Sequence, residues 1–345
     1  MKAFAKLRPE AGAMGLIERP EPTPESDEAL VEVSHAALCG SDLGIFEFED
    51  AFSFMEFPRI VGHEYAGTVL EVGEDVSRFA PGDRVAEEVI RGCGDCRSCA
   101  TGNGQLCDDA RVTGVHHDGA FAPYITVPER DLHRLPDDFD LRTGSLVEPT
   151  GVAARAVKRN ARLTVGDTVF VEGPGPIGVL VALFARAQGA RVVVSGLDSD
   201  AAFRLPLLED LGFETVNVGN ESVESVRAEH ADGGFDVVFD ATGHESGLRT
   251  AVEAVRKRGQ IVVLGLTDRA ELSFTSLVRG EVSVQCSYTY DYEDFESAIA
   301  FLRNDGVPVD RIVDDRFSLR HGTAAYEAAL EKRTLKPVFD LDQLR

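Results

Sequence analysis

The glycine-rich turn at residues 173–178 most constrains how this chain can fold. It has the pattern G-x-G-x-x-G, after an apolar strand-like run at 168–172 and before a helical pattern at 177–188. In this setting the glycines permit a tight turn, a close backbone approach to a pyrophosphate and close helix–strand packing. The helix N-terminus adds free N–H groups. A glycine-rich turn without a ligand is the alternative. The pattern predicts a dinucleotide-binding turn formed by Gly173, Gly175, Pro176, Ile177 and Gly178.

Six strand-like runs alternate with helix-length stretches over residues 151–285, which predicts a doubly wound parallel sheet. The runs lie at 168–171, 191–195, 214–218, 235–240, 260–264 and 281–286. The first 150 residues instead show short alternating apolar segments separated by turn signals. Two amphipathic helices and a short strand are expected at 292–304, 322–332 and 336–340. The predicted fold class is α/β, with a Rossmann dinucleotide-binding domain that begins near residue 151.

The ends of the parallel strands should carry further cofactor contacts, because strand ends face the dinucleotide crevice in such a sheet. Ordinary strand-to-helix turns are the alternative. The candidate positions follow the fourth and fifth strands and are Asp240, Gly243, Leu264, Gly265 and Leu266.

The end of the second strand bears on the choice between NAD and NADP. An NAD-specific site usually places a carboxylate there, which accepts from the ribose 2′-OH and repels a 2′-phosphate. Gly196 stands at this place, Asp198 follows two residues later, and Arg204 lies on the next helix. The sequence therefore predicts that NADP is accepted at least as well as NAD, with Arg204 as a candidate phosphate partner. If Asp198 swings into the site, NAD preference is restored.

Four of the six cysteines fall in one short loop with the spacing C-x2-C-x2-C-x7-C. Four thiolates suit a tetrahedral zinc ion. An iron–sulfur cluster uses the same ligand set, whereas disulfides are disfavoured by the tight spacing and a reducing compartment. The spacing predicts a structural-zinc lobe over residues 91–108, with the ligands Cys93, Cys96, Cys99 and Cys107.

A second set of possible metal ligands lies outside this loop and comprises Cys39, His63, Glu64 and Glu148. Thiolate, imidazole and carboxylate groups all bind zinc well. Taken one at a time, each residue has an ordinary structural interpretation as a buried cysteine, a core histidine or a surface charge. The motifs that flank these residues favour the metal site.

The chain resembles the zinc-containing medium-chain dehydrogenase/reductase family over nearly its whole length. The resemblance is carried by CGSD at 39–42, VGHEYAG at 61–67, PGDRV at 81–85, the cysteine loop, Glu148-Pro149 and GPGPIG at 173–178. Within the family the chain is most similar to the sorbitol and related polyol dehydrogenases. The His63-Glu64 pair together with Glu148-Pro149 is typical of that branch.

The resemblance implies a GroES-like β-barrel catalytic domain built from residues 1–150 and 286–345, with the Rossmann domain of residues 151–285 inserted between them. It implies an active site in the cleft between the domains and a homodimer or homotetramer. It also implies a catalytic zinc ion, held by Cys39, His63 and Glu64, with Glu148 as a fourth, exchangeable ligand or a water partner.

The resemblance further implies hydride transfer between an alcohol, of the polyol or sugar type, and NAD(P). In this scheme Ser41 first takes the hydroxyl proton and Asp42 orients His63. Gly44 stands where many relatives carry a histidine that ends the proton relay, so water, Glu148 or another acid is left as the outlet. An aldose 1-dehydrogenase or a threonine dehydrogenase is the alternative. A non-enzymatic dinucleotide-binding protein is disfavoured because the ligand set is intact.

The acidic composition limits the partners. Asp and Glu number 59 against 35 Lys and Arg, of which six are Lys, and the formal net charge is −24. Such a surface repels nucleic acid and anionic membranes. The composition is typical of proteins from salt-loving organisms, an ordinary acidic protein being the alternative. With no apolar run long enough to span a bilayer and no secretory pattern at the start, we expect a cytoplasmic protein.

Overall fold

The computed structural model describes residues 1–303 and 307–341, and the chain divides into two compact units. The first unit comprises Met1–Glu148 together with Asp291–Arg345, and the second comprises Pro149–Tyr290. The second unit is therefore a continuous insertion into the first. Helix α4 (Val147–Ala154) contains the point at which the chain passes from one to the other.

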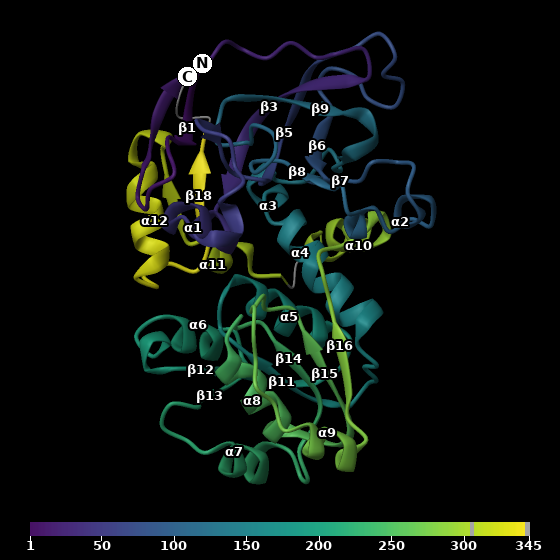
Figure 1. The fold of residues 1–345 in the computed structure, drawn as a ribbon, viewed down its shortest axis with the longest axis vertical. Helices are drawn as coiled ribbons and strands as arrows, with labels where there is room; N and C mark the ends of the chain where they lie inside the picture. The colour runs from purple at the N-terminus through teal and green to yellow at the C-terminus, as the bar shows by residue number, and fades with distance from the viewer. Residues whose placement is uncertain (304–306, 342–345) are drawn as a thin grey trace. The chain divides into compact units, whose positions relative to one another are not determined.

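The first unit is rich in β-structure (Figure 1). Its strands are β1 (Lys2–Lys6), β2 (Met14–Glu18), β3 (Glu28–Ala37), β4 (Arg59–Ile60), β5 (Glu64–Val72), β6 (Arg84–Glu87), β7 (Ile90–Arg91), β8 (Arg111–Val112), β9 (Tyr124–Pro128), β10 (Leu132–Arg134), β17 (Asp315–Phe317) and β18 (Pro337–Asp340). Its helices are α1 (Gly40–Glu47), α2 (Arg97–Ala100), α3 (Leu141–Gly144), α10 (Tyr292–Leu302), α11 (Val309–Ile312) and α12 (Gly322–Leu330). The main sheet has the order β10-β6-β5-β3-β18-β17, and β9 also pairs with β3.

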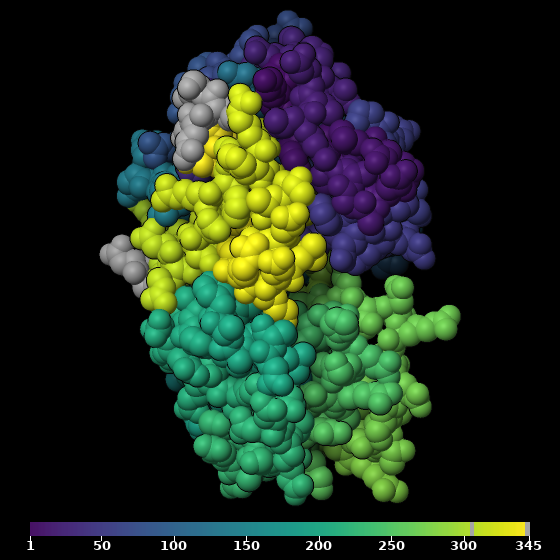
Figure 2. Space-filling model, turned by 90° about the vertical axis from the view of Figure 1, so that its left-hand side faces the viewer, coloured from purple at the N-terminus to yellow at the C-terminus, as the bar shows by residue number. Residues whose placement is uncertain are grey.

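Aromatic side chains from both ends of the chain close the core of this unit. The ring of Phe4 lies 6.0 Å from that of Tyr326 on α12, and Phe121 meets Phe339 on β18 at 4.5 Å between ring centroids. Figure 2 shows the C-terminal residues, in yellow, beside the N-terminal strands, in purple. Burying one such ring contributes about 1.5–3 kcal/mol, so the C-terminal segment is an integral part of this unit.

The second unit is a doubly wound parallel sheet, which confirms the predicted fold class. Its strands are β11 (Thr168–Glu172), β12 (Arg191–Gly196), β13 (Glu214–Asn217), β14 (Phe235–Asp240), β15 (Val255–Val263) and β16 (Ser283–Cys286), in the order β13-β12-β11-β14-β15-β16, and every pairing is parallel. Its helices are α5 (Pro176–Ala187), α6 (Arg204–Asp210), α7 (Val223–His230), α8 (Glu245–Ala254) and α9 (Phe274–Gly280). The strand order reverses between β11 and β14, where such sheets bind their ligands.

Several elements differ from the prediction. Strand β15 begins at Val255, five residues before the predicted start, because the charged run at 256–258 belongs to the strand and forms a bulge in it, with φ +60° at Arg258. Helix α9 and the three-stranded sheet β2-β1-β4 were not predicted. The predicted helix at 292–304 ends at Leu302, and residue 304 lies outside the described residues. Within the described part of the chain, no helix is long and apolar enough to cross a membrane.

Candidate active site and metal centres

The register of β3 and β5 brings Cys39, His63 and Glu64 together. Ala37 at the end of β3 pairs with Glu64 at the start of β5. Cys39 follows Ala37 by two residues and His63 directly precedes Glu64, so both lie at the same edge of the sheet. One ligand atom from each of the three lies within 4.8 Å of the others. His63 and Glu64 are buried.

The backbone on either side of this cluster is tightly fixed. Cys39 caps helix α1, and its N–H donates to Asp42 Oδ2 at 3.0 Å. Gly62 has φ +90°, and a Cβ there would lie 2.3 Å from the ring of Phe121. Since this conformation favours glycine and the space excludes a side chain, the position before His63 requires glycine. Asp42 therefore acts on Cys39 in this structure, and its Oδ1 has no hydrogen-bond partner among the described residues.

Charges converge on the cluster from several elements. Ser41 Oγ lies 3.4 Å from His63 Nε2. Burial opposes the charged imidazole, but Cys39 and Asp42 outweigh it and hold the pKa of His63 well above its usual range. Glu148, at the start of α4, is 8% exposed and adds to this effect, although it does not belong to the group of three ligand atoms within 4.8 Å.

The donor set fits a zinc ion. Thiolate, imidazole and carboxylate are the ligand types of catalytic zinc sites, which keep a fourth position open. Glu64 Oε1 is buried and has no hydrogen-bond partner among the described residues. A buried carboxylate oxygen without a donor is costly, and a metal ion at this place would satisfy it.

The four-cysteine loop also gathers its sulfur atoms. The sulfurs of Cys93, Cys96, Cys99 and Cys107 lie within 4.8 Å of one another. Cys96 and Cys99 approach to 3.5 Å between their sulfurs, and no cysteine of the chain forms a disulfide in the described structure. The N–H of Cys99 donates to Cys96 and lowers the pKa of that thiol to about 7. Four sulfurs at this spacing suit one tetrahedral ion.

The glycine-rich turn has the geometry of a phosphate cradle. Gly173 follows β11 with φ +96°, a conformation that favours glycine. A Cβ at Gly175, the residue before α5, would meet no heavy atom within 4 Å, so this side of the turn is open to a ligand. A Cβ at Gly178 would lie 1.9 Å from the carbonyl oxygen of Gly173, which explains the close helix–strand packing. Pro176 and Ile177 form the first turn of α5.

The loops after β14 and β15 are joined to each other. The N–H groups of Leu264 and Gly265 donate to the carbonyl oxygen of Asp240 at 2.9 and 3.0 Å. A Cβ at Gly265 would lie 2.2 Å from the nitrogen of Gly243. Leu266 is 80% exposed. The predicted positions after the two strands thus form one continuous rim at the carboxyl ends of the sheet.

Sequence reasoning missed a buried acid directly before the glycine-rich turn. Glu172 is 2% exposed and pairs in register with Asp240 on the neighbouring strand. Burial and the nearby Asp240 hold the pKa of Glu172 well above its usual range. The run VFVEG at 169–173 was interpreted as an apolar strand, and a single acid at its end gave no signal of its own.

The three candidate residues for coenzyme selectivity lie at and after the end of β12, and two of them already have protein partners. Gly196 ends β12, and Asp198 is exposed two residues later, where Asn217 and Asn220 donate to its Oδ1 at 2.8 and 2.7 Å. Arg204 Nη1 lies 3.6 Å from Oδ1 of the buried Asp200. Arg204 is therefore less available to a phosphate than the sequence suggested.

The phenylalanines at 46–57 mostly pack into the core. Phe46 stacks on Tyr326 at 5.1 Å, and Phe52 and Phe57 also lie against the core. Phe54 differs, since it is 56% exposed and stacks on His116 at 5.0 Å. Most of the phenylalanines in this stretch therefore serve core packing.

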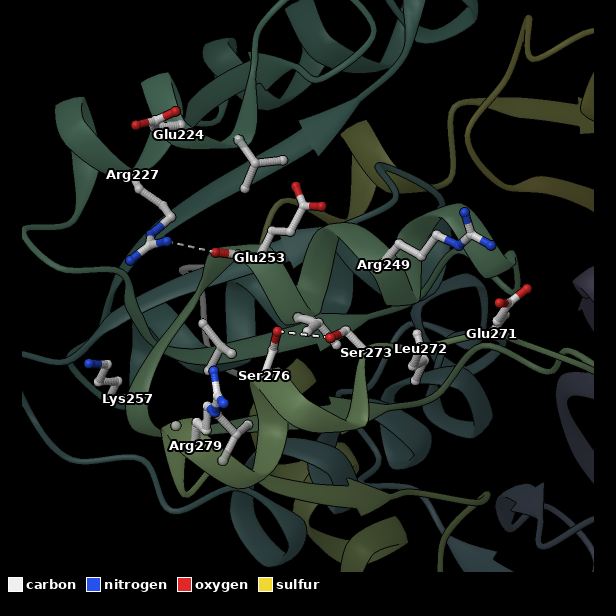
Figure 3. A pocket seen from close by; sticks show the side chains of 15 residues that line it. Glu224, Arg227, Arg249, Glu253, Lys257, Glu271, Leu272, Ser273, Ser276 and Arg279 are labelled. Carbon is white, nitrogen blue, oxygen red and sulfur yellow. Dashed lines mark hydrogen bonds between the residues drawn. The ribbon is translucent and has the colours of Figure 1, made fainter.

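A separate depression of about 970 Å³ in the second unit contains none of the predicted site residues (Figure 3). It lies among α7, α8 and α9. Its lining carries both charges, among them Arg227, Glu253 and Arg279. Its position argues against its being the cofactor site, which the glycine-rich turn defines.

Known proteins resemble this chain in sequence and in fold. Residues 25–137 match the family described as alcohol dehydrogenase GroES-like domain, and residues 176–304 match the family described as zinc-binding dehydrogenase. Sorbitol dehydrogenase of Halalkalibacterium halodurans is 31% identical and covers 97% of this chain and 98% of the relative. L-threonine 3-dehydrogenase of Saccharopolyspora erythraea is 32% identical and covers 99% of each. A solved zinc-binding dehydrogenase of Sinorhizobium meliloti 1021, bound to NADP, has a TM-score of 0.90 at 26% identity and covers 98% of both chains.

Fold, motifs and relatives together define the class. The chain belongs to the zinc-containing medium-chain dehydrogenase/reductase family. It is a zinc-dependent, NAD(P)-linked dehydrogenase of the alcohol and polyol type, with a GroES-like domain and a Rossmann-type parallel sheet.

Proposed function

We propose that this protein oxidises a secondary alcohol of a polyol or sugar-type substrate, with NAD(P) as the hydride acceptor. The observation that carries the proposal is the convergence of Cys39, His63 and Glu64 at the edge of β3 and β5, with the Ser41 hydroxyl against His63. A zinc ion bound there supplies Lewis-acid chemistry, which lowers the pKa of an alcohol. Cys39, His63 and Glu64 hold that ion, and Glu148 stays close enough to influence their charge.

The remaining roles concern the proton and the coenzyme. Ser41 would take up the hydroxyl proton as it passes its own proton on to water or to an acid such as Glu148, because its hydroxyl lies beside the ligand His63. Gly44 stands at the position where many relatives carry the histidine that ends the proton relay. A Cβ added at Gly44 would lie 2.8 Å from Glu49 Oε2, so the side chains of Glu49 and Phe52 occupy this space. The turn at 173–178 binds the pyrophosphate. NADP is accepted at least as well as NAD, since no carboxylate ends β12.

The four-cysteine loop is proposed to hold a second, structural zinc ion. Sulfur ligands alone leave no open position for a substrate. The loop lies between β7 and β8, whose pairing of Ile90 with Val112 closes its base. We further propose a cytoplasmic enzyme.

A homo-oligomer is proposed as the working form. Strand β16 is the edge of its sheet, and Val284 on it is 49% exposed. Phe274 and Val278 on α9 are 72% and 71% exposed. Exposed apolar surface beside an open sheet edge favours a contact with another chain. The mass of the protein in solution decides between a monomer and a dimer or tetramer.

A substrate panel tests the proposed function. The purified enzyme is assayed for NADH or NADPH formation with polyols, aldoses, L-threonine and simple secondary alcohols. We expect the highest kcat/KM with a polyol. Threonine is the second candidate, because a threonine dehydrogenase matches the chain at 32% identity over its whole length. A clear preference for threonine or an aldose would overturn the polyol assignment and leave the family intact.

A further inference from the structure

A buried lysine shares the cluster of candidate zinc ligands. Lys336 is 1% exposed, and its ammonium group forms an ion pair with the carboxylate of Glu64. The side chains of both partners are almost fully enclosed, at 2% and 0% exposed. The two side chains of a buried ion pair of this kind stay together, because a single buried charge without its partner is costly.

The backbone around Lys336 is fastened to the same site. Its N–H donates to Asp314 Oδ1 at 3.1 Å. The carbonyl oxygen of the next residue, Pro337, accepts from the N–H of Leu38 at 3.0 Å, directly before Cys39. The main chain at Lys336 is therefore fixed beside Cys39, and the ion pair with Glu64 fixes the far end of the side chain.

The charges of the cluster need a cation. Lys336 pairs with the carboxylate of Glu64, and a ligand atom of Glu64 lies within 4.8 Å of the sulfur of Cys39, so two acidic groups lie beside one buried ammonium group. In the absence of a metal ion, Lys336 balances the buried carboxylate of Glu64. When a divalent ion is present, two cations attract the same carboxylate and repel each other at short range.

We propose that Lys336 is a resident counter-cation of the metal site, whose ammonium group on Glu64 Oε2 offsets the charge that would attract a metal ion to Glu64 Oε1. This inference rests on the proposed zinc-binding role of Cys39, His63 and Glu64. It assigns Lys336 as a positioning residue, with an effect on metal affinity opposite to that of a simple support. Removing a support would weaken metal binding, whereas removing a competitor strengthens it.

The experiment measures zinc retention by the full-length protein against a graded chelator. Zinc should leave the protein in separate steps as the chelator concentration rises. The step that belongs to this site is the one that His63→Ala lacks. Lys336→Met should require about tenfold more chelator for that step, because a like charge beside the metal ion is removed, whereas removal of an ordinary partner of a metal ligand lowers metal affinity. Lys336→Gln should behave in the same way, and Lys336→Arg should behave as the wild type. In the metal-free state both neutral variants should melt below the wild type, because Glu64 is then buried without a cation.

Lys6 supplies a matched control in the same unit. It is also fully buried, and its Nζ donates to the carbonyl oxygens of Glu10 and Phe46 at 2.7 and 2.9 Å. Lys6→Met should lower the melting temperature with and without metal and leave the chelator step unchanged. Zinc release from Lys336→Met or Lys336→Gln at equal or lower chelator would overturn the competitor role. If the wild type shows no step that His63→Ala lacks, the proposed zinc site itself fails, and the role of Lys336 fails with it.

Discussion

At the residue scale, coenzyme selectivity can be tested at Asp198, because β12 ends at Gly196 without a carboxylate and Asp198 is the next acid along the chain. Its Oδ1 is held by the amides of Asn217 and Asn220 near the end of β12. Asp198→Ala should raise the ratio of kcat/KM for NADP to that for NAD by about tenfold, because a negative charge near the 2′-phosphate is lost. The measurement is kcat/KM for both coenzymes with one good alcohol.

Asp232→Ala removes an exposed acid of the same unit and should leave the ratio unchanged. An unchanged ratio in Asp198→Ala would show that selectivity lies elsewhere. Gly196→Asp is a less direct test, since a Cβ at Gly196 would lie 2.9 Å from Leu205 and 3.1 Å from Pro174. Crowding and charge would then change together.

Individual ligands were predictable where a local motif marks them. Cys39 and His63 stand 24 positions apart in the sequence, yet each sits in its own recognisable motif, and the structure brings them together. Lys336 had no such signal. A lysine before a short strand indicates a surface position, and only the pairing of β18 with β3 places it beside Glu64. The orienting role of Asp42 towards His63 stays a prediction: its charge acts on His63, while its Oδ2 accepts from the N–H of Cys39, since Asp42 stands at the third position of the helix that Cys39 caps.

At the scale of elements, one guanidinium joins the base of the cysteine loop to the sheet. Arg91 on β7 donates to Glu87 at 2.8 Å and lies 3.2 Å from Asp131. Glu87 also accepts from Tyr65 and Thr113, both at 2.7 Å. Glu87 and Asp131 thus share Arg91, and Asp131 also lies 3.6 Å from the exposed Arg130. Burial, with a contribution from Glu87, raises the pKa of Asp131 to about 7 despite Arg91.

This network predicts a pH dependence of stability. The pKa of Asp131 in the folded state exceeds the unfolded value of 3.8. The folded state therefore binds an extra proton at intermediate pH, and that stabilisation is present below about pH 4 and lost as the pH rises through about 7. Asp131→Asn should remove about 1–3 kcal/mol of the decline in unfolding free energy between pH 5 and 8. Denaturant titrations at both pH values measure it.

Asp137→Asn, an exposed acid nearby, is the control and should keep the slope of the wild type. An Asp131→Asn variant with the same slope as the wild type would mean that Asp131 is charged across this range.

Elements with strong periodicity were predictable, and short or charged ones were not. The strands of the parallel sheet follow apolar runs that end at glycine or acid residues, as at Gly196 and Asp240. Helix α9 was missed because its outer side chains, Phe274 and Val278, are exposed and apolar, which gives no amphipathic pattern. Residues 155–160 form a π-helix whose sequence, RAVKRN, is typical of an ordinary helix end.

The whole molecule carries a charge of −24, which predicts a dependence on salt. The Debye length falls from about 10 Å at 0.1 M to about 3 Å at 1 M salt, so repulsion among the carboxylates is screened. The melting temperature should rise by about 5 °C or more between 0.1 and 2 M KCl, and activity should rise with it. Sucrose at matched osmolarity should reproduce only a small part of this rise. Equal melting temperatures across the KCl series would refute salt dependence.

The central claim is that one chain holds two zinc ions with separate roles, one for the reaction and one for the fold. The most direct measurement is zinc content, melting temperature and initial rate, determined side by side for wild type, Cys39→Ser and Cys96→Ser. We predict two zinc ions in the wild type. Cys39→Ser should lose one ion and at least 99% of the rate at a nearly unchanged melting temperature, since the metal supplies several kcal/mol of transition-state stabilisation. Cys96→Ser should lose one ion and melt at a lower temperature, and the protein that stays folded should keep its rate. A wild type without zinc at residues 93–107, or a Cys39→Ser variant that keeps both ions and its rate, would contradict the account.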